Sequence, residues 1–205
     1  KIKRITTKRR CIMPCMAKIG RRKDREEGIC VCCMIRKMII FIPKLLIKKM
    51  KELLTPEALL TNFKDVRTLT RKVIEAFPEK DLFEFSNANL RPFSRMVEEF
   101  LMITNYIFTE TLHEKHTSFY TEGQFPTTKE DVLALWDKAT EIIDNEWKEI
   151  ENYTQPLTIY QMTFSFTQWI LYAIENETHH RGQGYIYLRT LQIDPPYFWG
   201  RESFQ

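Results

Sequence analysis

Three polar side chains lie at positions where the sequence otherwise places apolar residues. Asn176 and His180 are four residues apart, so they share one face of a helix. Glu99 follows Met96 by three residues in an earlier amphipathic segment, so it also points toward the interior. A buried Asn or His left unpaired costs about 1–3 kcal/mol, and a carboxylate is almost never buried without a partner. We therefore expect Glu99, Asn176 and His180 to converge between two helices.

The chemistry that such a set can support is divalent-metal binding. Carboxylate oxygens and imidazole nitrogens are metal ligands, and the interior of a helix bundle is a usual place for a metal site. We predict a metal site at Glu99, Asn176 and His180, with zinc, nickel or manganese as the candidate ion. A structural interpretation stays open, in which His180 bonds to Glu99 and Asn176 completes a buried network.

The residues beside His180 extend this candidate site. His179 is turned by about 100° around the helix, so it is expected to face either a neighbouring helix or the rim of a cleft. Arg181 is expected in the cleft or as support behind the metal ligands. Gly182 and Gly184 each cost about 0.8–1 kcal/mol relative to alanine inside a helix. Two such glycines predict close approach by another backbone, with a local kink as the alternative.

Four amphipathic segments must position these residues, and they predict an all-α fold, a four-helix bundle. The expected helices cover about residues 55–77, 92–116, 127–150 and 160–191. Thr55 and Pro56 suit the cap and first position of the first helix, and Thr127–Glu130 resembles a capping box for the third. No connection shows the alternation typical of a strand. His113 and His116 are expected to be solvated or to pack against a loop.

The first 51 residues differ in charge and cysteine content from the rest. They contain 17 Lys and Arg against 3 Asp and Glu, a net charge of +14. Because the whole chain carries +4, the other 154 residues carry −10. All five cysteines lie between positions 11 and 33. A cysteine-free body fits a reducing cytosol and needs no disulfides.

We interpret residues 1–49 as a basic extension that is disordered or translated from upstream of the true start, with residues 50–205 as the domain. Its cysteines, spaced C-x3-C and C-x-C-C, offer a zinc site as an alternative. Its basic run Arg21–Arg25 offers binding to nucleic acid or anionic lipid. The apolar run Met38–Ile47 is too short to span a bilayer, and neither a membrane partner nor a signal peptide is expected.

The last expected helix resembles that of the DinB/YfiT-like superfamily of damage-inducible bundle proteins. The matching residues are His179-His180-Arg181-Gly182-Gln183, then Tyr187-Leu188-Arg189 and Pro195-Pro196. Arg91-Pro92-Phe93 resembles the opening of the family's second helix. The resemblance covers about residues 50–205 and implies a four-helix bundle.

Typical members bind a divalent metal through three histidines, one on the second helix and an H-x3-H pair on the last. Of these, this chain keeps only His180; Asn176 takes the first position of the pair. Alignment on the Arg91 motif places Glu99 at the second-helix position, and a register shifted by one turn would place Met102 there.

The resemblance implies two functions. The first is a thiol-dependent transferase or hydrolase linked to stress response, in which the degenerate set holds a metal ion. The alternative is a non-catalytic bundle that has lost the metal and acts through dimerisation or small-ligand binding. A cytoplasmic homodimer is expected in both cases. Binding of nucleic acid by the basic extension is a third hypothesis, and the acidic body disfavours contact with phosphates.

Overall fold

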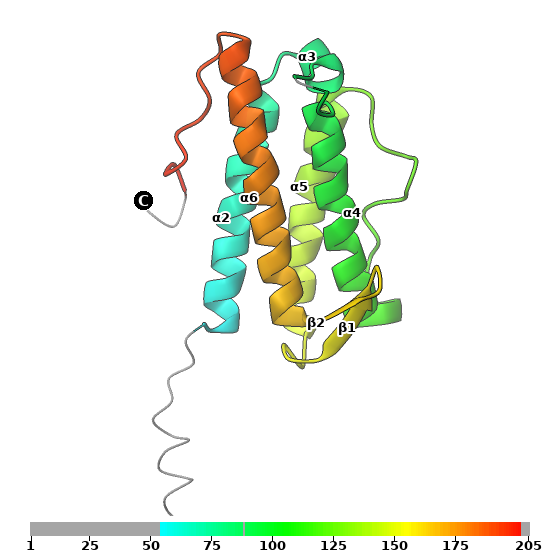
Figure 1. The fold of residues 1–205 in the computed structure, drawn as a ribbon. Coiled ribbons are helices and arrows are strands. Elements are labelled where there is room, and N and C mark those ends of the chain that lie inside the picture. The colour runs from blue at the N-terminus through cyan, green and yellow to red at the C-terminus, as the bar shows by residue number, and fades with distance from the viewer. Residues whose placement is uncertain (1–53, 88, 202–205) are drawn as a thin grey trace, which may run out of the picture. The chain divides into compact units, whose positions relative to one another are not determined.

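Four long helices build the structure, a computed structural model that describes residues 54–87 and 89–201 (Figure 1). They are α2 (Pro56–Ala76), α4 (Phe93–Leu112), α5 (Lys129–Glu146) and α6 (Phe166–Thr190). Helix α2 packs against α5 and α6, and α6 also packs against α4. The predicted all-α four-helix bundle is confirmed. The extension 1–49, with its cysteines, lies outside the described residues.

Side-chain caps fix where two of the helices start. The hydroxyl of Thr55 accepts a hydrogen bond from the backbone N–H of Ala58 at 3.2 Å, as the sequence predicted for α2. Helix α5 is capped by Thr128, which accepts from the backbone N–H of Asp131 at 3.2 Å. The capping box expected at Thr127–Glu130 is therefore wrong, and the N-cap lies one residue later.

A β-hairpin precedes α6, so the prediction that the last helix begins at Tyr160 is wrong, as is the expectation of no strands. Its strands are β1 (Pro156–Ile159) and β2 (Met162–Ser165), paired antiparallel. Tyr160 and Gln161 form the turn with φ of 49° and 66°, the left-handed pair that a tight two-residue hairpin requires. Ser165 and Gln168 then form the capping box that starts α6.

Short helical turns occupy segments that were expected to be loop or regular helix. They are α3 (Glu79–Glu84) and the 3-10 turns η1 (His113–Lys115) and η2 (Trp147–Glu149). Helix α4 ends at Leu112, earlier than the predicted end at His116. Its continuation is interrupted by His113, whose φ of 53° is left-handed and ends a right-handed helix.

The core confirms the apolar stripe that helical spacing predicts for the second helix. It also confirms the stripe of the last helix at Phe166, Trp169, Ala173 and Tyr187, but not at Asn176 and His180. The predicted α4 residues are all buried: Phe93, Met96, Val97, Phe100, Ile103 and Ile107. After Ala173, the buried line of α6 runs through Glu177 and Arg181. Asn176 and His180 lie beside that line, half-buried and turned toward α4.

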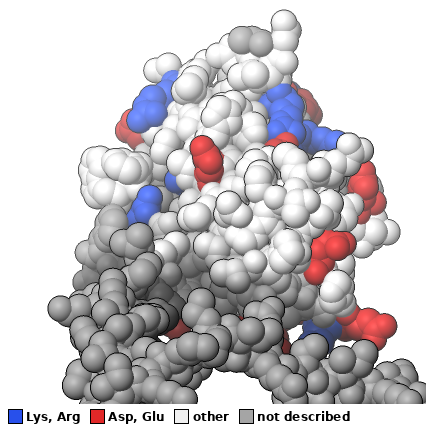
Figure 2. All heavy atoms as spheres, turned by 60° about the horizontal axis from the view of Figure 1, so that its bottom comes forward, with Lys and Arg blue, Asp and Glu red and all other residues white. Residues whose placement is uncertain are grey.

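The face at the hairpin end of the bundle carries charges of both signs. On the described part of this face, Lys and Arg side chains are interspersed with Asp and Glu (Figure 2).

None of the helices in the described part of the chain combines the length and apolar character needed to cross a membrane.

Candidate functional site

Helices α4 and α6 bring Glu99, Asn176 and His180 together. The Nδ2 amide of Asn176 donates to Oε1 of Glu99 at 2.9 Å, and Nε2 of His180 lies 3.6 Å from the same oxygen. The Glu99 and His180 side chains are 20% and 16% exposed. Glu99, and not Met102, therefore faces Asn176. The role of these residues as metal ligands stays a prediction.

Arg91 completes this group, and the sequence analysis assigned it no role in the site. Its Nη2 forms an ion pair with Oε2 of Glu99 and lies 3.3 Å from Nε2 of His180. We call Arg91, Glu99, Asn176 and His180 the α4–α6 cluster. Arg91 lies two residues before the first residue of α4, so helical spacing gave no signal for its contact with Glu99.

Gln183 fixes the orientation of both neighbouring histidines. Its Oε1 lies 3.1 Å from Nδ1 of His180, and its amide nitrogen lies 3.3 Å from Nε2 of His179. A carboxamide oxygen only accepts, so this contact is matched by the His180 tautomer that has its proton on Nδ1 and its lone pair on Nε2. That lone pair faces the guanidinium of Arg91, which only donates.

Opposing effects act on the carboxyl of Glu99. Partial burial acts to raise its pKa, but the hydrogen bond from Asn176 and the ion pair with Arg91 outweigh burial. The net result is a pKa below the ordinary value. Glu99 is therefore held as a carboxylate by a donor on each oxygen.

The donor set of this cluster does not fit a divalent ion as it is arranged. Both oxygens of Glu99 already accept, one from Asn176 and one from Arg91, and Arg91 also faces the His180 lone pair. Oδ1 of Asn176 is buried and accepts no hydrogen bond from any described residue. The described residues also contain no group of three or more His, Cys, Asp or Glu that could hold a metal.

Arg181 does not join this cluster, and the structure does not bring it to the pocket beside Glu99. It is 3% exposed, and its Nη1 donates to the backbone carbonyl of Val66 on α2 at 3.1 Å. The single step from His180 to Arg181 turns the side chain from α4 to α2. His179 is exposed, with its ring centroid 4.8 Å from that of His180.

Two buried charges between α2 and α6 were missed by the sequence analysis. Glu177 and Arg67 are 1% and 0% exposed. Burial raises the pKa of Glu177, although the charge of Arg67 and a hydrogen bond from Thr70 oppose it. Burial likewise lowers the pKa of Arg67 to about 10. Glu177 lies four residues after Ala173, and this core spacing was the signal.

Only one of the two helical glycines is required by packing. A Cβ at Gly184 would lie 2.7 Å from a ring atom of Phe93, whereas a Cβ at Gly182 would meet nothing within 4 Å. The predicted close approach is therefore made by a side chain, and not by a backbone. It lets the start of α4 pack directly on α6.

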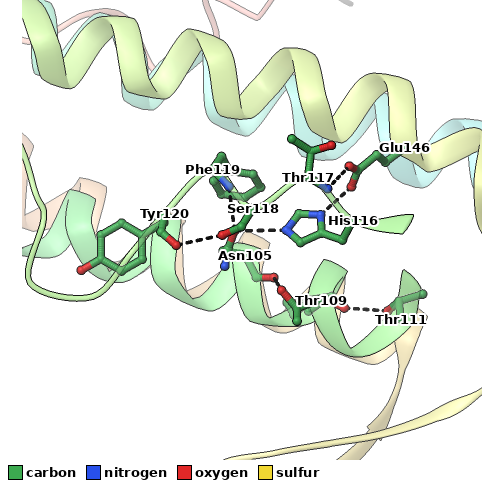
Figure 3. A network of polar contacts seen from close by, with 10 residues as sticks. Asn105, Thr109, Thr111, His116, Thr117, Ser118, Phe119, Tyr120 and Glu146 are labelled. Carbon is green, nitrogen blue, oxygen red and sulfur yellow. Dashed lines mark hydrogen bonds and ion pairs between the residues drawn. The ribbon is translucent and has the colours of Figure 1, made fainter. Parts of the chain in front are cut away.

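A second polar network ties the loop after η1 to α4 and α5 (Figure 3). Nδ1 of His116 lies 2.6 Å from Oε2 of Glu146, and Nε2 lies 3.1 Å from Oδ1 of Asn105. The same Asn105 oxygen accepts from the backbone N–H of Phe119 at 3.0 Å. The His116 side chain is 2% exposed. His116 is therefore a loop-packing residue, one of the two interpretations left open.

A pocket of about 450 Å³ opens beside the α4–α6 cluster. Its lining residues are Arg91, Arg95, Glu98, Glu99, Met102, Glu122 and Gly123. The volume lies within the range of small-molecule sites. Arg95 forms an ion pair with Glu98, so two cationic and three anionic side chains surround one hollow.

Comparisons with known proteins identify the family. The structure is similar to the crystal structure of a DinB-like protein from Bacillus cereus ATCC 10987, with a TM-score of 0.55 and 16% sequence identity. The similarity covers 68% of this chain and 95% of that one, and at this identity it shows the fold alone. No curated protein matches the sequence. The model of the DinB family matches residues 50–201, which confirms the resemblance seen in the sequence: this chain belongs to the DinB family.

Proposed function

We propose that this DinB-family protein binds a small zwitterionic molecule in the pocket beside the α4–α6 cluster. The observation that carries the proposal is the mixed lining of that pocket of about 450 Å³, to which Arg91 and Arg95 contribute positive charges and Glu98, Glu99 and Glu122 negative charges. Amino acids and short peptides have this chemistry, because each carries an ammonium and a carboxylate.

The ligand would exchange partners with ion pairs that are already present. The Arg95 side chain is 61% exposed while its partner Glu98 is 11% exposed, so Arg95 is the member that can turn toward a ligand carboxylate. The ligand ammonium would then approach Glu98 or Glu122. Charge-assisted hydrogen bonds of this kind fix orientation as well as affinity.

A second candidate is a metal-dependent enzyme of the DinB type, a thiol-dependent transferase or hydrolase linked to stress response. The observation that favours it is the direction of the acceptors. The His180 Nε2 lone pair and the Glu99 carboxylate face one another. The buried Oδ1 of Asn176 accepts no hydrogen bond from the described residues. This candidate requires Arg91 to leave the cluster before an ion enters.

Membership in the family also supports a homodimer, and the cysteine-free body fits the cytosol. We propose both as expectations for the full chain. The net charge of −10 on residues 52–205 argues against nucleic acid as the partner of the body.

Methionine-methyl NMR of the full chain tests the proposed ligand site. Met102 lines the pocket, whereas Met96 on the same helix is 1% exposed and serves as the internal control. We expect amino acids or dipeptides from a panel to shift the Met102 signal and leave Met96 unchanged. Arg95→Gln should weaken that response. A Met102 signal that stays fixed across the whole panel would contradict the proposal.

A further inference from the structure

We propose that the guanidinium of Arg91 is the resident cation of the α4–α6 cluster and that it excludes divalent ions. Removing it would open a divalent-cation site formed by Glu99, Asn176 and His180. This inference concerns the side chains of the cluster alone and does not require the zwitterion proposed above.

The acceptor atoms of the α4–α6 cluster point toward one another. The two carboxylate oxygens of Glu99 and the Nε2 lone pair of His180 are turned toward one another, with Nε2 3.6 Å from Oε1. Asn176 places a carboxamide against the same carboxylate, with Nδ2 2.9 Å from Oε1. Rotation of that carboxamide would present Oδ1, which is buried and accepts from no described residue. Such a concentration of acceptors requires a cation or strong donors.

Arg91 meets that requirement at the two strongest acceptors. Its Nη2 pairs with Oε2 of Glu99 and lies 3.3 Å from Nε2 of His180. A divalent ion bound by the same two atoms would occupy the space of the guanidinium and be repelled by its charge. Arg91 and a divalent ion are therefore competitors for one place.

Arg91 can be replaced in a variant to measure this competition, because its side chain lies outside the core. Its side chain is 41% exposed and comes from the segment just before α4, so it can be removed without opening the core. Arg95 provides a matched control. It lines the same pocket and carries the same charge, but its ion-pair partner is Glu98.

Manganese is the appropriate probe for the full chain. It favours oxygen ligands, whereas the thiols of the five cysteines favour softer metals such as zinc. Free Mn²⁺ is measured by electron paramagnetic resonance during titration of wild type, Arg91→Ala, Arg91→Gln and Arg95→Ala. The double variant Arg91→Ala/His180→Ala locates the ion, and thermal melting of each variant confirms that it is folded.

We expect Arg91→Ala and Arg91→Gln to bind Mn²⁺ about tenfold more tightly than wild type, since the loss of one adjacent positive charge is worth at least that factor. Arg95→Ala should change the affinity by less than about threefold, because Arg95 pairs with Glu98 and not with an acceptor of the cluster. The added His180→Ala should abolish the gain. Equal binding by wild type and both Arg91 variants, or an equal gain in Arg95→Ala, would overturn the inference. Neither result would decide zwitterion binding, which the Met102 signal measures separately.

Discussion

Asn176 on α6 donates its side-chain amide to the carboxylate of Glu99 on α4 across 2.9 Å. This bond joins α4 to α6 at two of the positions where the resemblance to the family implies metal ligands. In the structure, the side chains of Asn176 and Glu99 bond to each other, and Glu99 also forms an ion pair with Arg91.

Removing the Asn176 amide should cost stability. In Asn176→Ala, Oε1 of Glu99 loses a donor while it is half-buried, so we expect the free energy of unfolding to fall by about 1–2 kcal/mol. Urea denaturation measures the change. Glu175→Ala, at the adjacent exposed position, is the control and should stay within about 0.5 kcal/mol of wild type. Equal losses in the two variants would show that the bond contributes nothing.

The acid sensitivity of the fold should depend on Glu99. Its pKa is lowered in the folded state, so ionised Glu99 stabilises the fold above the ordinary pKa of 4.5. That contribution is lost as the pH falls through the lowered value. Wild type should therefore lose stability more steeply than Glu99→Gln below about pH 4.5. Denaturation curves at pH 7, 4.5 and 3 give the slopes, and parallel slopes would be inconsistent with the ion pair.

The two glycines of α6 should respond oppositely to the same change. In Gly184→Ala, the new Cβ meets the Phe93 ring at 2.7 Å, and overpacking should cost about 1–3 kcal/mol. In Gly182→Ala, nothing lies within 4 Å, so the better helix former should stabilise the protein by about 0.5–1 kcal/mol. Thermal melting distinguishes the two signs. If both variants melt at one temperature, Phe93 does not pack against Gly184.

Loss of His116 should release the loop that follows η1. His116→Ala removes contacts to both Glu146 and Asn105, and we expect about 1–3 kcal/mol of destabilisation from the polar groups left buried. Hydrogen exchange at the Phe119 amide, which Asn105 holds, should accelerate. His113→Ala is the control, since that residue is exposed. Unchanged exchange at Phe119 would argue against the network.

The sequence predicted those features that depend on local pattern. The Thr55 cap and the apolar stripe of α4 follow from neighbouring residues, and the meeting of Glu99 with Asn176 follows from helical spacing plus the cost of unpaired burial. Four amphipathic segments were likewise sufficient for the fold class.

Features set by a small rotation or a long side chain could not be predicted in this way. The stripe predicted for α6 was one position off at Asn176 and His180, because the buried residues there are Glu177 and Arg181. Arg91 lies outside the helix, and the reach of its flexible side chain has no periodic signal. The hairpin was missed because its turn is Tyr160-Gln161, without the glycine or asparagine that usually marks left-handed turns.

Anomalous diffraction at the manganese edge tests the central claim most directly. Crystals of the full wild-type chain grown with Mn²⁺ should show the Arg91 guanidinium against Glu99 and His180, with no anomalous peak between those two side chains. Crystals of Arg91→Ala grown in the same way should show that peak. A manganese peak bounded by Glu99, Asn176 and His180 in the wild-type crystal, with Arg91 turned away, would contradict the claim.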